Sequence, residues 1–131
     1  MDKTNPRILI VDDDANLLAT MGDIFKLKGF EPVTARSGGA ALAQLEKYHF
    51  DVALIDLRLE DISGLAVLKD IRERSPETEC ILLTGYASQS SAIEAIQMGA
   101  YGFFQKPFDM EQVLLSTQRA VEKNAARIAL Q

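Results

Sequence analysis

Several residues that can bind a metal ion or a phosphoryl group directly follow short apolar segments of this sequence. Three consecutive aspartates stand at positions 12–14, Asp56 follows a later segment, and Thr84 and Lys106 follow two more. Each of these residues alone has an ordinary structural role, since an aspartate can cap a helix and a lysine can lie in water. Their shared position after apolar segments is what indicates chemistry, provided that the fold brings the segment ends together.

Carboxylates brought within a few Å of one another repel, by roughly 4 kcal/mol per close pair at an effective dielectric constant near 20. A small divalent cation removes this conflict, and all-oxygen ligands with room for water favour Mg²⁺ over zinc. The sequence has one histidine and one cysteine, so no cluster of softer ligands competes. We therefore expect Asp13 and Asp56 to bind Mg²⁺, with Asp12 acting directly or through water.

Asp56 would then keep one carboxylate oxygen free as a nucleophile. An approaching phosphoryl group carries negative charge on three oxygens. The metal can neutralise one, the Lys106 ammonium a second, and the Thr84 hydroxyl with nearby backbone N–H groups the third. These residue types therefore fit phosphoryl transfer to Asp56, with an aspartyl phosphate as the product.

Five apolar segments rich in branched or aromatic residues alternate with five segments of helical periodicity. The expected strands lie at residues 8–11, 32–35, 52–55, 81–83 and 102–104. The expected helices lie around residues 17–25, 41–45, 65–71, 92–96 and 109–121. This alternation predicts a doubly wound α/β fold, with a parallel sheet covered by helices on both faces. In such sheets functional groups gather beyond the carboxyl ends of the strands, where the residues named above would meet.

Length and composition are those of one compact, water-soluble domain spanning residues 1–131. The 131 residues are 47% hydrophobic and 25% charged, and the lone Cys80 cannot form a disulfide within the chain. No apolar stretch has the length of a secretion signal or a membrane span, so we expect a cytoplasmic protein without membrane partners. The net charge of -5 argues against direct nucleic-acid binding.

The motifs resemble those of the receiver domains of bacterial response regulators, over about residues 7–123. Residues 8–14 resemble the family's acidic pocket and residues 52–59 its phosphoacceptor strand and loop, with Gly64 at the matching glycine. Residues 83–85 are similar to the switch threonine and its neighbours, and residues 103–108 to the strand that carries aromatic residues and a lysine. The resemblance implies a flavodoxin-like (βα)5 fold with strand order 2-1-3-4-5 and a cis peptide bond before Pro107.

The resemblance also implies a signalling role in a two-component system rather than a conventional enzyme. The phosphoryl group would come from the phosphohistidine of a sensor histidine kinase or a phosphotransfer domain, with Mg²⁺ as cofactor, and would be lost by slow self-catalysed hydrolysis. Phosphorylation would draw the Thr84 hydroxyl inward and let the Phe103 ring fill the space, which changes the surface that an effector reads. The implied site residues are Asp56 as phosphoacceptor, Asp12, Asp13, Asp56 and the Arg58 backbone carbonyl as metal ligands, Thr84, Gly85 and Lys106 as phosphate ligands, and Thr84 with Phe103 as the switch.

The sequence departs from the family pattern in the loop after Asp56 and at the switch aromatic. Glu60 and Ser63 stand where the family often has Pro and Asp, which leaves the rigidity of that loop open. Phe103 replaces a common Tyr, so the ring is kept and a hydroxyl is lost. Arg58 and Tyr86 flank the site, and we expect them to set the lifetime of the phosphoryl group by controlling access of water.

Three other functions compete with this interpretation. A flavin-binding protein of similar topology would place phosphate against the first strand's loop, where three aspartates would repel it. The pair Gly38-Gly39 precedes a helix without the pattern of a nucleotide-binding loop. An aspartate-nucleophile phosphatase usually has a second Asp two residues after the nucleophile, where this chain has Arg58. The third alternative is a receiver-like interaction module that is never phosphorylated.

The output of the domain is left open by the sequence. Residues 109–131 exceed what the last helix of a receiver needs, so this segment could continue into a linker, an effector domain or a homodimer contact. A stripe of small and apolar residues runs along it, formed by Val113, Thr117, Ala120, Asn124 and Ile128.

Overall fold

The computed structural model describes residues 5–85 and 89–129, with the backbone alone for residue 89 and residues 126–129. Strands and helices alternate along the whole described chain, as the sequence predicts. The strands are β1 (Arg7–Val11), β2 (Glu31–Ala35), β3 (Val52–Ile55), β4 (Glu79–Thr84) and β5 (Gly102–Gln105). The helices are α1 (Ala15–Leu27), α2 (Gly38–Lys47), α3 (Gly64–Arg74), α4 (Gln89–Gln97) and α5 (Met110–Ala129).

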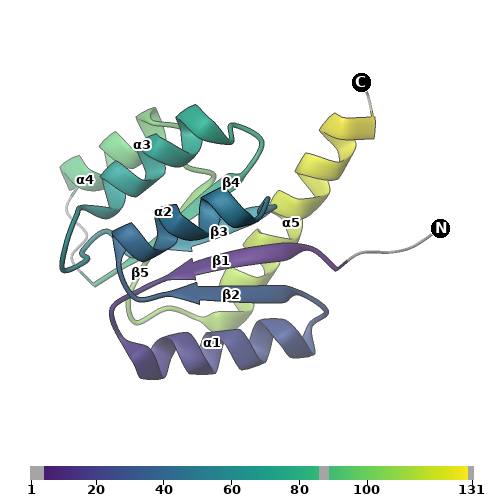
Figure 1. The fold of residues 1–131 in the computed structure, drawn as a ribbon, viewed down its shortest axis with the longest axis horizontal. Helices are drawn as coiled ribbons and strands as arrows, with labels where there is room; N and C mark the ends of the chain where they lie inside the picture. The colour runs from purple at the N-terminus through teal and green to yellow at the C-terminus, as the bar shows by residue number, and fades with distance from the viewer. Residues whose placement is uncertain (1–4, 86–88, 130–131) are drawn as a thin grey trace.

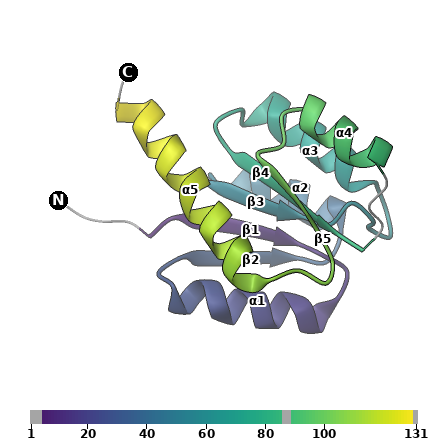
Figure 2. The same ribbon diagram turned by 180° about the vertical axis from the view of Figure 1, so that it is seen from behind.

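The five strands form one parallel sheet in the order β2-β1-β3-β4-β5, which confirms the doubly wound fold and the strand order. Helices α2, α3 and α4 cover one face, and α1 and α5 cover the other (Figures 1 and 2). Side chains of each strand alternate between these two layers. In β1, for example, Leu9 and Val11 join the core under α2 and α3, whereas Ile8 and Ile10 join the core under α1 and α5.

Capping side chains and a glycine mark the ends of α1 and the start of α5. Asp14 caps α1, since its carboxylate accepts hydrogen bonds from the N–H groups of Asn16 and Leu17. The Asp109 carboxylate accepts the N–H of Glu111 at the start of α5. Gly29 follows α1 and has a positive φ of 90° that a residue with a side chain rarely adopts. Local capping chemistry therefore sets the lengths of these helices.

The apolar residues of α4 are only partly covered. Ile93 and Ile96, which lie in the segment expected as the fourth helix, are 49% and 53% exposed. Ala95 is fully buried instead, and Met98 packs against the same core. In this short helix the small side chain lets the backbone approach the sheet, and the two isoleucines remain on the water side.

Cys80 lies fully buried in β4, where burial raises the pKa of its thiol to about 12. The thiol is therefore protonated at neutral pH and fills the core. Four residues of the α5 stripe, Val113, Thr117, Ala120 and Asn124, are buried, while the side chain of Ile128 lies outside the described part of the chain.

Within the described ranges no helix is both long and apolar enough to cross a membrane.

Gly64, the first residue of α3, lies against the backbone at the end of β3. An added Cβ would clash with the carbonyl oxygen of Asp56 and lie 2.6 Å from the Cα of Leu57. We expect Gly64→Ala to lower the free energy of unfolding by about 2 kcal/mol, because backbone cannot move aside as a flexible side chain can. Urea denaturation measures this.

Gly22→Ala in the middle of α1 is the matched control for that substitution. Its Cβ would lie 3.9 Å from the nearest atom, the Cγ2 of Thr34, so nothing has to move. We expect it to raise the free energy of unfolding by up to about 1 kcal/mol, since alanine favours a helix over glycine. Equal effects of the two substitutions would mean that the close approach at Gly64 carries no constraint.

Candidate functional site

Neighbouring strand ends deliver the acidic residues of the site. Asp12 follows β1 and Asp56 follows β3, and these two strands pair so that Val11 lies opposite Ile55. The pairing continues past the strand ends, because the N–H of Asp56 donates to the carbonyl of Val11 at 2.9 Å. Sheet geometry therefore places the side chains of Asp12 and Asp56 next to each other.

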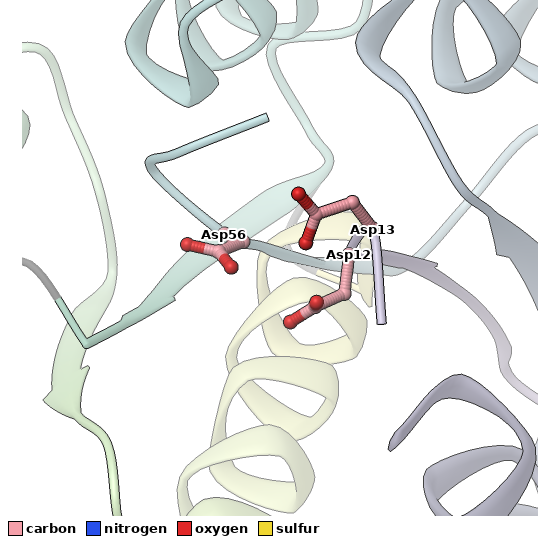
Figure 3. A group of neighbouring side chains, drawn as sticks. All are labelled: Asp12, Asp13 and Asp56. Carbon is pink, nitrogen blue, oxygen red and sulfur yellow. The ribbon is translucent and has the colours of Figure 1, made fainter. Parts of the chain in front are cut away.

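Asp12, Asp13 and Asp56 form one carboxylate cluster, in which an oxygen from each lies within 4.8 Å of the others. Figure 3 shows the three side chains projecting from the ends of β1 and β3 into the same region. Asp12 and Asp56 are buried and Asp13 is half-buried. The expectation that these aspartates meet is confirmed, and the all-oxygen donor set suits a hard cation.

Lys106 follows the edge strand β5 and reaches the same cluster. Its Nζ donates hydrogen bonds to Asp12 Oδ2 at 2.7 Å and to Asp56 Oδ2 at 3.0 Å. Its backbone N–H donates to the carbonyl of Thr84 at 2.8 Å, which extends the pairing of β4 and β5. The Lys106–Pro107 peptide bond is cis, as the family resemblance implies. The lysine thus bridges two buried carboxylates from different strands.

Burial and hydrogen bonding shift the pKa values of Asp12 and Lys106. Burial raises the pKa of Asp12, although the Lys106 hydrogen bond opposes this. Burial alone would lower the pKa of Lys106, but the hydrogen bonds that its ammonium donates to Asp12 and Asp56 outweigh this effect and raise the pKa. The lysine therefore stays protonated at neutral pH and supplies a positive charge to the cluster.

Backbone groups fix the orientation of the two buried carboxylates. Asp12 Oδ1 accepts the N–H of Asp14 at 2.9 Å, and Asp56 Oδ1 accepts the N–H of Arg58 at 3.1 Å. The Oδ2 atom of each aspartate faces Lys106. Each carboxylate is thus held at both oxygens, which preorganises the cluster.

An open cavity of about 460 Å³ lies over the cluster. Gly85 lines it, whereas Thr84 at the end of β4 is fully buried and is not among the lining residues. Phe103 is half-buried and packs against the core on the α2 to α4 side. Tyr86, expected beside the site, lies outside the described residues. The lining residues are Asp12, Asp13, Asp14, Asp56, Arg58, Leu59, Glu60, Gly85 and Lys106.

Three lining residues, Asp14, Leu59 and Glu60, were not predicted as site residues. Glu60 was treated only as a departure from the family's usual proline. The sequence did contain a signal that Glu60 belongs to the site. It lies four residues after Asp56, in the loop that already carries Arg58. It adds a further acidic group to the wall of the cavity.

A family profile described as the response regulator receiver domain matches residues 8–118. Among curated proteins, the chain is 40% identical over 116 residues to the regulatory protein AtoC of Escherichia coli K12, which covers 88% of this chain and 25% of that protein. The chain thus spans about a quarter of the length of that relative.

Solved structures agree with the family match. A CheY-like response regulator receiver domain protein from Methanospirillum hungatei has a TM-score of 0.91 at 30% identity, covering 94% of this chain and 98% of that one. A response regulator from Burkholderia pseudomallei, solved with a phosphorylated aspartic acid, a calcium ion and citrate, has a TM-score of 0.82 at 27% identity over 96% of this chain and 74% of that one.

The fold, the carboxylate cluster and the family match lead to the same assignment. A receiver domain implies a histidine kinase as the class of partner that supplies its phosphoryl group. The chain belongs to the response regulator receiver domains of two-component systems, signalling domains that are phosphorylated on an aspartate and are not conventional enzymes.

Proposed function

We propose that this chain accepts a phosphoryl group on Asp56 from the phosphohistidine of a sensor histidine kinase or a phosphotransfer domain, in an Mg²⁺-dependent reaction. One observation carries the proposal. Asp12 and Asp56 are the two buried carboxylates that belong to the acidic cluster, contact Lys106 and line the open cavity, and Asp56 is the one that follows the central strand β3. No other described aspartate combines a strand-end position between β1 and β4 with these three contacts.

Asp12, Asp13, Asp56 and the backbone carbonyl of Arg58 would hold the Mg²⁺. The three carboxylates fit this ion, because their oxygens converge within 4.8 Å at a cavity open to water. When bound, Mg²⁺ supplies positive charge to a phosphoryl oxygen. The side chain of Lys106 supplies a second positive charge, and its contacts with Asp12 and Asp56 place it within reach of that group.

In the transfer, a carboxylate oxygen of Asp56 forms a bond to phosphorus as the bond from phosphorus to the donor's histidine nitrogen breaks. Lys106 would then move its hydrogen bond from the carboxylate to a phosphoryl oxygen. The Thr84 hydroxyl and the backbone N–H of Gly85 would bind the remaining charge. Thr84 must turn toward the cavity to do so, since its side chain is fully buried in the unphosphorylated chain.

That movement of Thr84 would be the switch. β4 and β5 are paired, with Leu82 opposite Phe103 and Thr84 opposite Gln105, so a shift of Thr84 reaches β5 directly. The half-buried Phe103 ring would move into the vacated space and alter the outer surface of α4 and β5. A partner that prefers the altered surface would read phosphorylation as a shift between two populations.

We further propose that residues 1–131 form one cytoplasmic receiver domain with its core at about 7–123. α5 runs to Ala129 and would lead into a linker toward an effector domain or partner protein. The exposed Ile93 and Ile96 of α4 offer an apolar surface for a homodimer. The net charge of -5 supports no direct contact of this domain with nucleic acid.

The proposal is tested by incubating the chain with acetyl phosphate and Mg²⁺ and measuring its intact mass. We expect a gain of one phosphoryl group that EDTA prevents. No gain would favour the alternative of an interaction module that is never phosphorylated. Sustained hydrolysis of a generic phosphate ester would instead favour the phosphatase alternative, and the chromophore of a bound flavin would favour the third.

Arg58→Asn is expected to shorten the lifetime of the phosphoryl group severalfold. The Arg58 side chain is exposed and lines the cavity, so a shorter side chain would leave more room for the attacking water. Mass spectrometry after removal of acetyl phosphate gives the rate of dephosphorylation. Arg119→Asn on α5, outside that cavity, is the matched control and should decay like the wild type. An unchanged rate in Arg58→Asn would contradict the role assigned to this side chain.

A further inference from the structure

The loop between β3 and α3 is tied to the start of α2 by the side chain of Asp61. Its Oδ1 accepts the N–H of Gly38 at 2.9 Å and its Oδ2 accepts the N–H of Gly39 at 2.8 Å. Both N–H groups belong to the first turn of α2, where the helix itself provides no acceptor. One carboxylate therefore joins two elements that are more than twenty residues apart in the sequence.

The glycine pair at the start of α2 is shaped to receive this loop. An added Cβ at Gly38 would clash with the Cγ1 of Ile62 and lie 2.6 Å from its Cδ1. At Gly39 an added Cβ would lie 3.2 Å from Oδ2 of Asp61. The pair, which has no nucleotide-binding pattern around it, thus has a structural purpose: it lets the loop approach α2 closely.

The same loop forms one wall of the phosphorylation site. Arg58, whose N–H donates to Asp56, pairs with Ser63 in an isolated antiparallel bridge. The N–H of Gly64 donates to the carbonyl of Leu57 at 2.8 Å. These contacts fix the two ends of the loop, and Asp61 fixes its outer part. The position of the Arg58 backbone therefore depends on contacts at both places.

The Asp61 carboxylate is charged at neutral pH. Hydrogen bonds from Gly39 and Gly38 lower the pKa of the Asp61 carboxyl below its usual value of 3.8. Such a group contributes stability above its unfolded pKa, and that contribution is lost as the pH falls through the lower, folded value. The negative charge also lies at the positive end of the α2 dipole. The contact is thus fully formed under the conditions in which the domain would react.

We propose that Asp61 is a positioning residue for the metal site: its two hydrogen bonds to Gly38 and Gly39 hold the β3–α3 loop, and with it the Arg58 carbonyl, in place before the ion binds. The inference rests on the proposed function, since it takes Arg58 as a ligand of Mg²⁺. It also accounts for a loop that lacks the family's usual proline at position 60. A loop that is already ordered does not have to lose its freedom upon metal binding.

The test compares Asp61→Ala with Asp61→Asn and Ser37→Ala. The alanine and asparagine variants remove the same charge, but asparagine keeps one carbonyl acceptor. Ser37→Ala removes the other side-chain cap of α2, the hydrogen bond from the Ala40 N–H to the Ser37 hydroxyl, and leaves the loop alone. Calorimetry at neutral pH gives the Mg²⁺ affinity of each. Amide hydrogen exchange in EDTA gives the order of the metal-free loop, and urea denaturation shows that each variant is folded.

We expect Asp61→Ala to weaken Mg²⁺ binding by about tenfold, in line with other residues that orient metal ligands, and to speed exchange across residues 58–63. Asp61→Asn should lose less, and Ser37→Ala should bind Mg²⁺ like the wild type. Equal losses in the two Asp61 variants would show that charge alone matters, and an equal loss in Ser37→Ala would show that helix capping does. Either outcome, or an unchanged Asp61→Ala, overturns the inference. A wild-type chain that binds no Mg²⁺ would overturn the proposed function as well.

Discussion

Asp56→Asn is expected to gain no phosphoryl mass when it is incubated with acetyl phosphate and Mg²⁺. The side-chain amide has nearly the shape of the carboxylate, and its carbonyl oxygen can still accept the N–H of Arg58. It lacks the negative charge that makes the carboxylate a nucleophile and a metal ligand. The loss should therefore be complete at times when the wild-type chain is fully modified, as measured by intact mass.

Asp51→Asn is the matched control for this experiment. Asp51 stands just before β3, at the opposite end of the strand from Asp56, where its carboxylate accepts the N–H of Arg7. Asp51 has the same side chain as Asp56 and flanks the same strand, and we expect its variant to be phosphorylated like the wild type. A phosphoryl gain in Asp56→Asn would mean that the acceptor is a different residue.

Lys106→Met is expected to slow phosphorylation by about 10²- to 10³-fold, the usual cost of removing one group that stabilises charge in a transition state. Methionine keeps most of the apolar length of the lysine and removes its charge. The Nζ now lies 2.7 Å from Asp12 and 3.0 Å from Asp56, so its positive charge lies next to where phosphoryl charge would develop. The rate of mass gain at a fixed concentration of acetyl phosphate measures the effect.

The same substitution should make stability more dependent on Mg²⁺. Without Lys106, the buried Asp12 and Asp56 lose the cation that now compensates them, and the metal-free variant should lose about 2 kcal/mol of unfolding free energy. Saturating Mg²⁺ should restore part of this. Lys69→Met, on an exposed position of α3, should change neither rate nor stability. A Lys106→Met variant that reacts at the wild-type rate would show that the lysine has no role in the reaction.

The meeting of Asp12, Asp56 and Lys106 was predictable because it follows from topology. Alternating strands and helices give a parallel sheet, and the carboxyl ends of parallel strands lie at one edge. Alternation does not determine which strands are neighbours, since that depends on pairings distant in the sequence. The order β2-β1-β3-β4-β5 was therefore expected from family resemblance alone, and the structure confirms it.

Some contacts and exposures could not be predicted from the sequence. The bonds from Gly38 and Gly39 to Asp61 join the first turn of α2 to a loop without hydrophobic periodicity, so no sequence pattern connects them. The exposure of Ile93 and Ile96 also could not be read from spacing, because alanines and isoleucines of α4 compete for the side facing the sheet. In both cases the outcome depends on how closely two backbones approach, which residue types restrict but do not determine.

The contacts of Lys106 bear on how folding of the domain depends on a metal ion. An ammonium bound to two buried carboxylates acts as a built-in counter-ion, so the chain need not wait for a metal before its strands assemble. Under the proposed function, acquisition of the native state and loading with magnesium would be separate events. The level of the free ion would then govern how many molecules are competent to respond to a stimulus, rather than how many exist in native form.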